Sequence, residues 1–331
     1  MTSVSLPGTL RRTSRIGFGT SGLSGELTYK ESMALLEAAF DAGIRHFDTA
    51  PIYGVGASER ILGDFLARRR DQVTVTTKFG LMPPRAQSFL LHVKSMIRPA
   101  LRRIPGLKSH LAQTIKGLSR PASYSAAAMS SSLAASLRIL RCDWIDLFLL
   151  HEADAMDISD ELRKALDDAV RSGLIGAWGV GSSVEKIDRV VARDPSAGRV
   201  LQFEWSLLSD YPAIYSDSFC ITHGALASSL ARLNPLIATL EQRQRLSNEI
   251  GVDFLDKRAL PQLIIRAALA ANAGGIVLFS SKNIIHVCDV ASLVHCHEHE
   301  TTRKFLDVVD RSLPLIAELT KSSATASLKN M

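Results

Sequence analysis

Strand-like and helix-like stretches alternate along most of the chain. Short runs of β-branched or apolar residues predict strands at 44–49, 73–78, 144–150, 174–180, 200–203, 219–222 and 275–279, and a first strand precedes Gly19. Apolar residues at helical spacing predict helices at 28–42, 57–69, 126–141, 159–172, 184–192, 235–250, 260–271, 283–293 and 302–320. Strands followed by helices, about eight times in succession, favour a closed (β/α)8 TIM barrel over an open sheet. No linker rich in Gly, Pro or Ser divides the chain, so we expect one barrel domain over residues 1–331.

The composition is that of an ordinary globular protein. Apolar residues make up 46% of the chain and charged residues 22%. No apolar run reaches the roughly 18 residues that a membrane crossing needs, and residues 1–15 lack the apolar core of a secretory signal. The four cysteines, Cys142, Cys220, Cys288 and Cys296, show no CxxC spacing and are typical of reduced thiols. We therefore expect a cytoplasmic protein without integral membrane contact.

The positive charge of the chain is concentrated in one segment. The formal net charge is +6, yet residues 81–120 hold eight basic residues and no acidic one, so the remainder is slightly acidic. One interpretation is a patch that binds anionic ligands or surfaces. The other is a solvated insertion whose leucines and isoleucines pack on the body while its arginines face water. Aromatic residues do not alternate with the bases, so we predict no nucleic-acid partner.

This basic segment directly follows the third predicted barrel strand. We call residues 81–124 the basic insertion and expect it to begin at the catalytic face, because loops after barrel strands lie there. Its apolar residues recur near helical spacing. Our hypothesis is an amphipathic helical cover beside the substrate pocket.

Several ionisable residues fall at predicted strand ends. Asp48, Lys78 and His151 each end a strand, and Tyr53 lies in the loop after Asp48. An ammonium beside a phenol lowers the pKa of the phenol, and a carboxylate keeps that ammonium charged. A neutral imidazole can polarise a carbonyl. Such a set can protonate a carbonyl oxygen, and a nicotinamide cofactor is implied because no side chain supplies hydride. His46 lies in mid-strand, which favours a packed histidine over a catalyst.

Three sequence blocks resemble a known family. The segment 43–63, GIRHFDTAPIYGVGASERILG, strongly resembles the signature of the aldo-keto reductase family. The segments 77–80, TKFG, and 136–151, which ends in DLFLLH, resemble the next two blocks of that family. The resemblance covers about residues 15–80 and 125–320. It implies a (β/α)8 barrel and NAD(P)H-dependent reduction of a carbonyl group.

The resemblance also implies a role for each member of the catalytic set. Tyr53 would be the proton donor and Lys78 the neighbour that lowers its pKa. Asp48 would be the partner of Lys78, and His151 would orient the carbonyl. The implied substrate is a small aldehyde, ketone or sugar carbonyl.

Cofactor-binding residues follow from the same resemblance. Gln202 matches the residue that binds the carboxamide, and Trp205 matches the aromatic residue that stacks on the nicotinamide. The residues matched to the nicotinamide end are Gly19, Thr20, Ser21, Asp48, Ser182, Gln202 and Trp205, and those matched to the adenosine phosphate end are Ser280, Ser281, Lys282 and His286.

The chain departs from the family pattern in three places. Ser182 stands where the family commonly has asparagine, and Thr222-His223-Gly224 stands where it has Ser-Pro-Leu before the diphosphate. Ser280 and His286 stand where members that prefer NADPH often have lysine and arginine. Lys282 and a predicted helix N-terminus can still bind a 2′-phosphate. NADP(H) is therefore the favoured cofactor, with NAD(H) as the alternative.

Two other kinds of function fit parts of the sequence. One is an NADP(H)-binding regulatory or docking module with little turnover. The other is a barrel lyase or epimerase that uses Lys78 as a base or Schiff-base former, which would not need Gln202, Trp205 or the block at Ser281. Histidines and cysteines gather between 286 and 299, but their spacing matches no standard zinc pattern, so we predict no metal.

Overall fold

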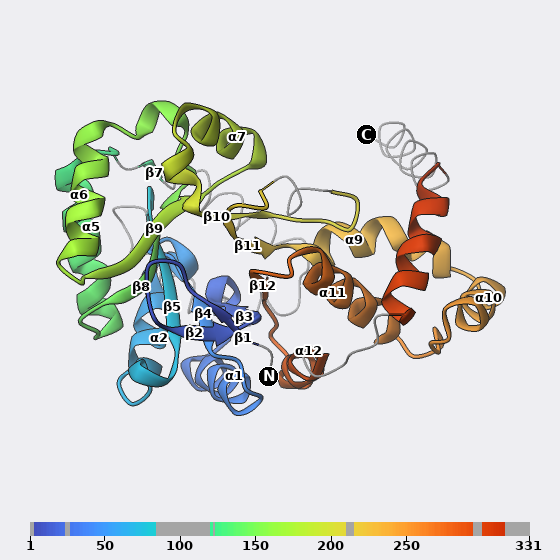
Figure 1. Cartoon of the computed structure of the whole chain (residues 1–331). Coiled ribbons are helices and arrows are strands. Elements are labelled where there is room, and N and C mark those ends of the chain that lie inside the picture. The colour runs from blue at the N-terminus through green and yellow to red at the C-terminus, as the bar shows by residue number, and fades with distance from the viewer. Residues whose placement is uncertain are drawn as a thin grey trace, which may run out of the picture.

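The computed structural model describes residues 3–23, 27–83, 120–121, 123–209, 215–293 and 300–314. Eight parallel strands in it form a closed barrel (Figure 1). In spatial order they are β3 (Ile16–Gly19), β4 (His46–Asp48), β5 (Thr74–Phe79), β8 (Ile145–His151), β9 (Ile175–Gly181), β10 (Val200–Glu204), β11 (Phe219–His223) and β12 (Ile276–Phe279), which pairs with β3 again. The (β/α)8 barrel predicted from the sequence is confirmed.

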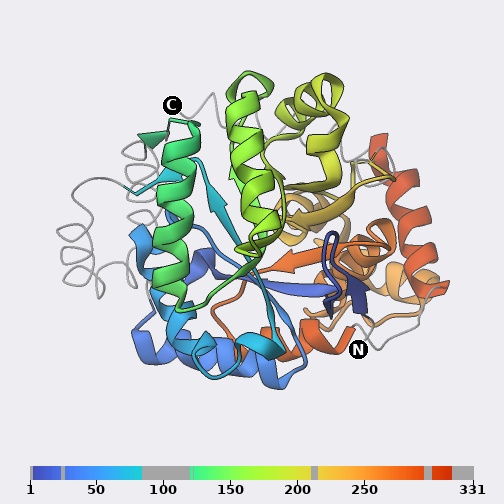
Figure 2. The same ribbon diagram turned by 60° about the vertical axis from the view of Figure 1, so that its left-hand side comes forward.

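Helices surround the barrel and connect its strands (Figure 2). They are α1 (Tyr29–Asp41), α2 (Ala57–Leu66), α5 (Ala126–Leu140), α6 (Asp160–Arg171), α7 (Val184–Arg193), α9 (Ala225–Leu233), α10 (Leu240–Ile250), α11 (Ala259–Ala271) and α12 (Ile284–Ser292), and residues 300–314 are also helical. Most lie within a few residues of their predicted bounds. The described residues 300–314 are helical and overlap the helix predicted at 302–320, whose residues 315–320 lie outside the described part.

The single helix predicted at 235–250 is wrong. The structure has α9 before that range, a 3-10 turn at Asn234–Ile237, and then α10. Pro235 explains the break, because proline has no N–H to continue the hydrogen bonds of α9. A new helix starts after Thr239, whose side chain forms a capping box with Gln242.

A hairpin that we did not predict covers the amino-terminal end of the barrel. Its strands are β1 (Ser3–Ser5) and β2 (Arg12–Ser14), which pair antiparallel. Val4 and Leu6 pack there against inward-facing residues of the barrel such as Leu147 and Ile276. Three-residue strands are too short to show a hydrophobic period, which explains why the sequence did not reveal them.

A polar cluster lies inside the barrel, one layer below Asp48. His46 is fully buried, and its ring nitrogens lie 2.9 Å from Thr74 Oγ1 and 3.1 Å from Thr76 Oγ1. Burial lowers the pKa of His46 to about 4, so the imidazole is neutral near pH 7. Both ring nitrogens are engaged by threonines, which agrees with the interpretation of His46 as a packed histidine.

The second and third strand–helix units of the barrel pack around a buried carboxyl group. Glu59, in the first turn of α2, accepts hydrogen bonds from Thr77 Oγ1 at 2.7 Å and Ser136 Oγ at 2.9 Å. Burial raises the pKa of Glu59. One turn further on, a Cβ at Gly63 would lie 2.3 Å from the carbonyl oxygen of Ile139, so only glycine permits this contact between α2 and α5.

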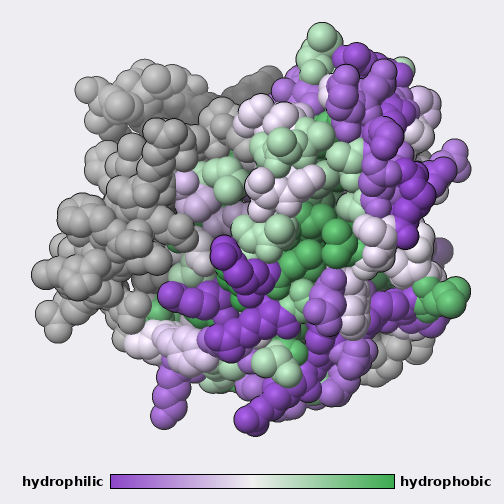
Figure 3. All heavy atoms as spheres, turned by 90° about the vertical axis from the view of Figure 1, so that its left-hand side faces the viewer, coloured by the Kyte–Doolittle hydropathy of each residue, from purple (hydrophilic) through white to green (hydrophobic). Residues whose placement is uncertain are grey.

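The outer face near α5 carries few charges. Figure 3 shows apolar residues near the middle of this side of the molecule, with hydrophilic residues to the right and below. Within α5 the one charged residue is Arg138. In the part of the chain that the structure describes, no helix has both the length and the apolar character that a bilayer crossing would require.

The basic insertion begins and ends in a short strand pair. β6 (Leu81–Met82) and β7 (Arg120–Pro121) run antiparallel, with Leu81 opposite Pro121 and Met82 opposite Arg120. Residues 84–119 and 122 lie outside the described residues, and so does the helical cover that we expected there.

Candidate active site

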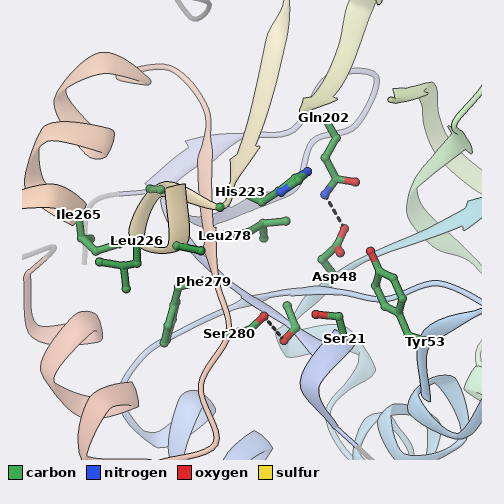
Figure 4. A pocket seen from close by; sticks show the side chains of 14 residues that line it. Ser21, Asp48, Tyr53, Gln202, His223, Leu226, Ile265, Leu278, Phe279 and Ser280 are labelled. Atoms are coloured by element: carbon green, nitrogen blue, oxygen red, sulfur yellow. Dashed lines mark hydrogen bonds between the residues drawn. The ribbon is translucent and has the colours of Figure 1, made fainter. Parts of the chain in front are cut away.

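A cavity of about 330 Å³ opens at the carboxyl ends of the barrel strands (Figure 4). Six of the site residues expected from the sequence line it: Gly19, Ser21, Asp48, Tyr53, Gln202 and Ser280. They come from the end of β3 and the turn after it, from the end of β4, from the loop that follows β4, from the middle of β10, and from the position after β12. Residues from five separate stretches of chain therefore meet in one cavity, at the end of the barrel where such folds place their chemistry.

The ammonium group of Lys78 forms three hydrogen bonds beneath this cavity. Its Nζ donates to Asp48 Oδ1 at 2.7 Å, to the carbonyl oxygen of Thr49 at 3.0 Å and to Tyr53 Oη at 3.3 Å. Lys78 and Asp48 are each only 2% exposed. A buried ion pair with additional hydrogen bonds holds its groups in fixed positions, so the orientation of the ammonium toward the phenol is determined by the fold.

Burial and charge act in opposite directions on these groups. Burial alone would lower the pKa of Lys78, but Asp48 and Tyr53 together leave it above its ordinary value, so the ammonium form persists. Burial raises the pKa of Tyr53, and Lys78 only partly offsets that rise. Lys78 therefore acts on the pKa of Tyr53 in the expected direction, but burial outweighs it and the net shift is upward. The phenol is protonated near neutral pH.

His151 completes the set on the far side of the phenol. Its ring lies edge-on to the ring of Tyr53, with centroids 6.1 Å apart and an interplanar angle of 87°. Burial, followed by the nearby charge of Lys78, lowers the pKa of His151 to about 3, so the imidazole is neutral. Its Nδ1 is buried without a hydrogen-bond partner among the described residues. The structure thus brings Asp48, Tyr53, Lys78 and His151 together.

Gln202 connects this set to the next wall of the cavity. Its Nε2 donates to Asp48 Oδ2 at 2.8 Å, and its carbonyl oxygen on the main chain accepts from the N–H of Ser182 at 3.0 Å. The hydroxyl groups of Ser182 and of Thr20 are buried and have no partner in the described part of the chain. Such hydroxyls are available to water or to a ligand, although neither residue lines the cavity itself.

Trp205 is not part of the cavity lining. Its side chain is buried, and its Nε1 donates to the carbonyl oxygen of Ser209 at 2.9 Å. The indole is therefore held in a buried position, and its stacking on a nicotinamide ring stays a prediction.

The residues expected at the adenosine phosphate end divide into two groups. Ser280 lines the cavity, and its hydroxyl donates to the carbonyl oxygen of Gly19 at 2.8 Å. Ser281, Lys282 and His286 lie beyond it, at the start of α12. Lys282 and His286 are exposed there, and Ser281 Oγ accepts from the N–H of Asn283 at 3.1 Å. This arrangement leaves Lys282 and His286 accessible at a helix N-terminus.

The sequence matched Thr222-His223-Gly224 to the segment before the diphosphate, but it did not predict α9, which builds the adjoining part of the cavity. His223, Gly224, Ala225, Leu226 and Ala227 form one wall, and further lining residues that were not expected are Ile265, Leu278 and Phe279. Gly224 adopts φ +80° directly before α9, which an L side chain rarely adopts. The glycine after β11 was a usable indication of a helix start. The helix itself was not predicted because its buried face, which consists of Ala225, Ser229 and Leu233, is short and includes a polar residue.

No metal site appears among the described residues. No group of three or more histidine, cysteine, aspartate or glutamate side chains there could hold an ion. Residues 294–299, which include several of the histidines and Cys296 considered above, lie outside that part of the chain.

Fold and site together define a (β/α)8 barrel with a buried carboxylate, ammonium and phenol at the carboxyl ends of its strands. A model of the aldo/keto reductase family matches residues 15–217, more than half of the chain. The chain therefore belongs to the aldo/keto reductase family.

Individual relatives share parts of the chain. It is 34% identical over 181 residues to D-threo-aldose 1-dehydrogenase of a Pseudomonas species, a match that covers 51% of this chain and 50% of the relative. It is 29% identical over 241 residues to 6-dehydroglucose reductase of Agrobacterium fabrum, covering 66% of this chain and 69% of the relative. The chain spans about half the length of several curated relatives that it matches.

Solved structures show the same fold over nearly the whole chain. A glycerol dehydrogenase from Gluconobacter oxydans has a TM-score of 0.69 at 21% identity, covering 94% of this chain and 96% of that one. An aldo-keto reductase from Klebsiella pneumoniae in complex with NADPH has a TM-score of 0.63 at 21% identity, covering 93% and 95%. At this identity the likeness concerns the fold alone.

Proposed function

We propose that this protein is an NADP(H)-dependent oxidoreductase that reduces an aldehyde, ketone or sugar carbonyl, with Tyr53 as the proton donor. The observation that carries the proposal is the contact of Lys78 with both Asp48 and Tyr53 at the edge of the cavity. The Klebsiella relative in complex with NADPH supports the choice of cofactor. The sugar dehydrogenase and reductase names of the relatives support the substrate class.

Each of the four polar residues has its own role in the proposed reduction. Tyr53 is a phenol that can give its proton to the carbonyl oxygen. Lys78 stays charged and stabilises the phenolate that remains, while Asp48 keeps Lys78 in place. His151 is neutral, so it can donate a hydrogen bond to the carbonyl without competing for the proton of Tyr53.

The cavity offers suitable partners for a nicotinamide dinucleotide, which when bound supplies the hydride. Gln202 and Ser182 can hold a carboxamide, and the buried hydroxyl of Ser182 has no other partner in the described part of the chain. Gly224 to Ala227, at the start of α9, line the cavity, and the main-chain N–H groups of a helix start can bind a diphosphate. Lys282, at the start of α12, is the group that would select a 2′-phosphate.

We further propose that the barrel is one domain and that residues 81–124 form an insertion at its catalytic face. The support is that β6 starts two residues after the end of β5, the strand that carries Lys78. Its pairing with β7 brings the two ends of the insertion together at that face.

The test is oxidation of NADPH, followed at 340 nm, with a panel of aldehydes, ketones and reducing sugars. Turnover with at least one class supports the proposal. Tight NADPH binding without turnover of any carbonyl would favour the regulatory or docking module instead. Turnover that needs no nicotinamide cofactor would favour a lyase or epimerase based on Lys78.

A further inference from the structure

A second imidazole faces the cavity from a position to which the mechanism assigns no role. His223 ends β11, opposite Glu204 of β10, and its carbonyl oxygen accepts from the N–H of Trp205 at 2.8 Å. The next residue, Gly224, turns the chain into α9. Figure 4 shows the ring of His223 between the first turn of α9 and the amide of Gln202. The backbone on both sides of His223 is thus fixed, and its side chain is aimed into the cavity.

Charges reach this imidazole from several elements. The carboxylates of Asp48 (β4), Glu204 (β10) and Glu152, which follows β8, favour its protonated form, and Lys78 (β5) opposes it. His151, at the end of β8, is close enough to respond to the charge of His223. His223 is exposed to the cavity, but the protein atoms around its ring still outweigh the carboxylates and lower the pKa of His223, so in the free protein the ring is neutral near pH 7.

Glu204 places a negative charge at the same helix end. Its Oε1 accepts a hydrogen bond from Ser228 Oγ in the first turn of α9. A Cβ on Gly224 would lie 2.8 Å from Glu204 Cγ, so this side chain lies directly against the start of the helix. A carboxylate there neutralises part of the positive helix end and would repel an incoming anion. An anion that binds beside α9 therefore needs a compensating positive group nearby.

We propose that His223 is that group: it binds the diphosphate of the cofactor in its imidazolium form, so that the protein takes up a proton when the cofactor binds. The inference rests on the proposed function, because it takes the ligand of this cavity to be a dinucleotide. The dinucleotide diphosphate keeps its charge near neutral pH, whereas histidine gains one, and a charge-assisted hydrogen bond favours the protonated ring.

The consequence is an affinity that depends on pH. Binding and protonation are reciprocal, so a ligand that favours the imidazolium binds more tightly where protons are abundant. Between the pKa of His223 in the free protein and its higher pKa in the complex, the dissociation constant rises by up to about tenfold per pH unit. At pH values below or above that range, the contribution of His223 to the dissociation constant does not change with pH.

The experiment measures the dissociation constant of NADP⁺ by calorimetry between about pH 6 and pH 8.5, for the full chain and for His223→Gln. The 2′-phosphate of the ligand contributes equally to both proteins, so the difference isolates His223. Repeating each titration in two buffers with different ionisation enthalpies gives the number of protons taken up. We expect the rise of the dissociation constant over this range to be at least fivefold larger in the unmodified protein, with a fractional proton uptake that His223→Gln abolishes.

Glu204→Gln is the companion variant, which keeps the inference testable if His223→Gln does not fold. Removing this carboxylate takes away one of the charges that favour the imidazolium, so the pH dependence should move to lower pH while remaining as steep. Equal pH dependence of His223→Gln and the unmodified protein, or an unmoved profile in Glu204→Gln, would overturn the role of His223. Absence of NADP⁺ binding at every pH would instead overturn the proposed function, and this inference with it.

Discussion

Lys78 Nζ lies 2.7 Å from Asp48 Oδ1 and 3.3 Å from Tyr53 Oη, with the carboxylate and the ammonium both almost fully buried. The pair joins adjacent barrel strands, β4 and β5, at their carboxyl ends. Burying an ion pair costs desolvation free energy that its attraction only partly offsets, so the pair adds little to stability. Its role here is to hold a positive charge beside the phenol.

Asp48→Asn should destabilise the protein strongly, because it leaves Lys78 as a buried charge without its partner. We expect a loss of about 3–5 kcal/mol in the free energy of unfolding, measured with urea at pH 7. The matched control is Asp168→Asn, which removes the exposed partner of Lys164 and Arg171 and should cost less than about 1 kcal/mol. Similar small losses in both variants would contradict the buried pair.

Tyr53→Phe should abolish carbonyl reduction and leave NADPH binding intact. The change removes the proposed proton donor while keeping the ring against His151, and general acid catalysis is worth roughly 10²- to 10⁴-fold. Initial rates and NADPH titrations measure the two effects separately. Tyr29→Phe, a change on the surface, should leave both unaltered. Turnover of Tyr53→Phe within threefold of the unmodified protein would remove Tyr53 from this role.

Lys282→Ala should weaken NADPH binding selectively, by about 1–3 kcal/mol for the loss of a charge-assisted contact with the 2′-phosphate. Dissociation constants for NADPH and NADH measure the selectivity. Lys257→Ala, which removes an exposed lysine before α11, should change neither value. An equal loss for both cofactors in Lys282→Ala would show that this residue does not read the 2′-phosphate.

Stability should fall as the pH is lowered from about 6.5 to 4, because His46 is buried as a neutral ring with a pKa of about 4. In the unfolded chain the same group titrates near 6.5, so the unfolded state binds the extra proton throughout this window. The contribution of His46 is complete above pH 6.5, and its loss approaches about 3 kcal/mol near pH 4.

Urea unfolding at a series of pH values measures this effect. The pKa of His151 is lowered as well, so this residue also makes the free energy of unfolding fall as the pH is lowered. His46→Gln should therefore reduce the slope of the unfolding free energy against pH by about one proton without abolishing it. An unchanged slope in His46→Gln would show that His46 is not the group responsible.

Thr77→Val should destabilise the protein by about 1–3 kcal/mol, because buried Glu59 loses one of its two hydroxyl donors. The pKa of Glu59 is already raised in the folded state, so its contribution to stability is lost as the pH rises through that value. With one donor fewer the pKa rises further, and the loss should be larger at pH 8 than at pH 5. Ser136→Ala should show the same pH-dependent loss in the free energy of unfolding. A loss that is equal at pH 5 and pH 8 would contradict the ionisation of Glu59.

Much of the architecture could be predicted from local sequence. The alternation of strand-like and helix-like runs was sufficient for the barrel, because each unit carries its own hydrophobic period and turn residues. The strand ends also placed Asp48, Lys78 and His151 at one face, since parallel barrel strands end on the same side. The block around Tyr53 identified the family before any geometry was known.

Other features depended on contacts between residues far apart in sequence. The break at Pro235 and the hairpin at the barrel end were missed because their elements are too short to show a period. Trp205 directly follows β10 and His223 ends the neighbouring strand β11, yet packing buries the indole and leaves the imidazole in the cavity. Lys78 lowers the pKa of Tyr53, as the sequence suggested, but burial raises that pKa by more. Sequence by itself determines which groups can meet at a strand end; how much water is removed around each one is decided by the tertiary structure, because desolvation depends on every neighbour at once.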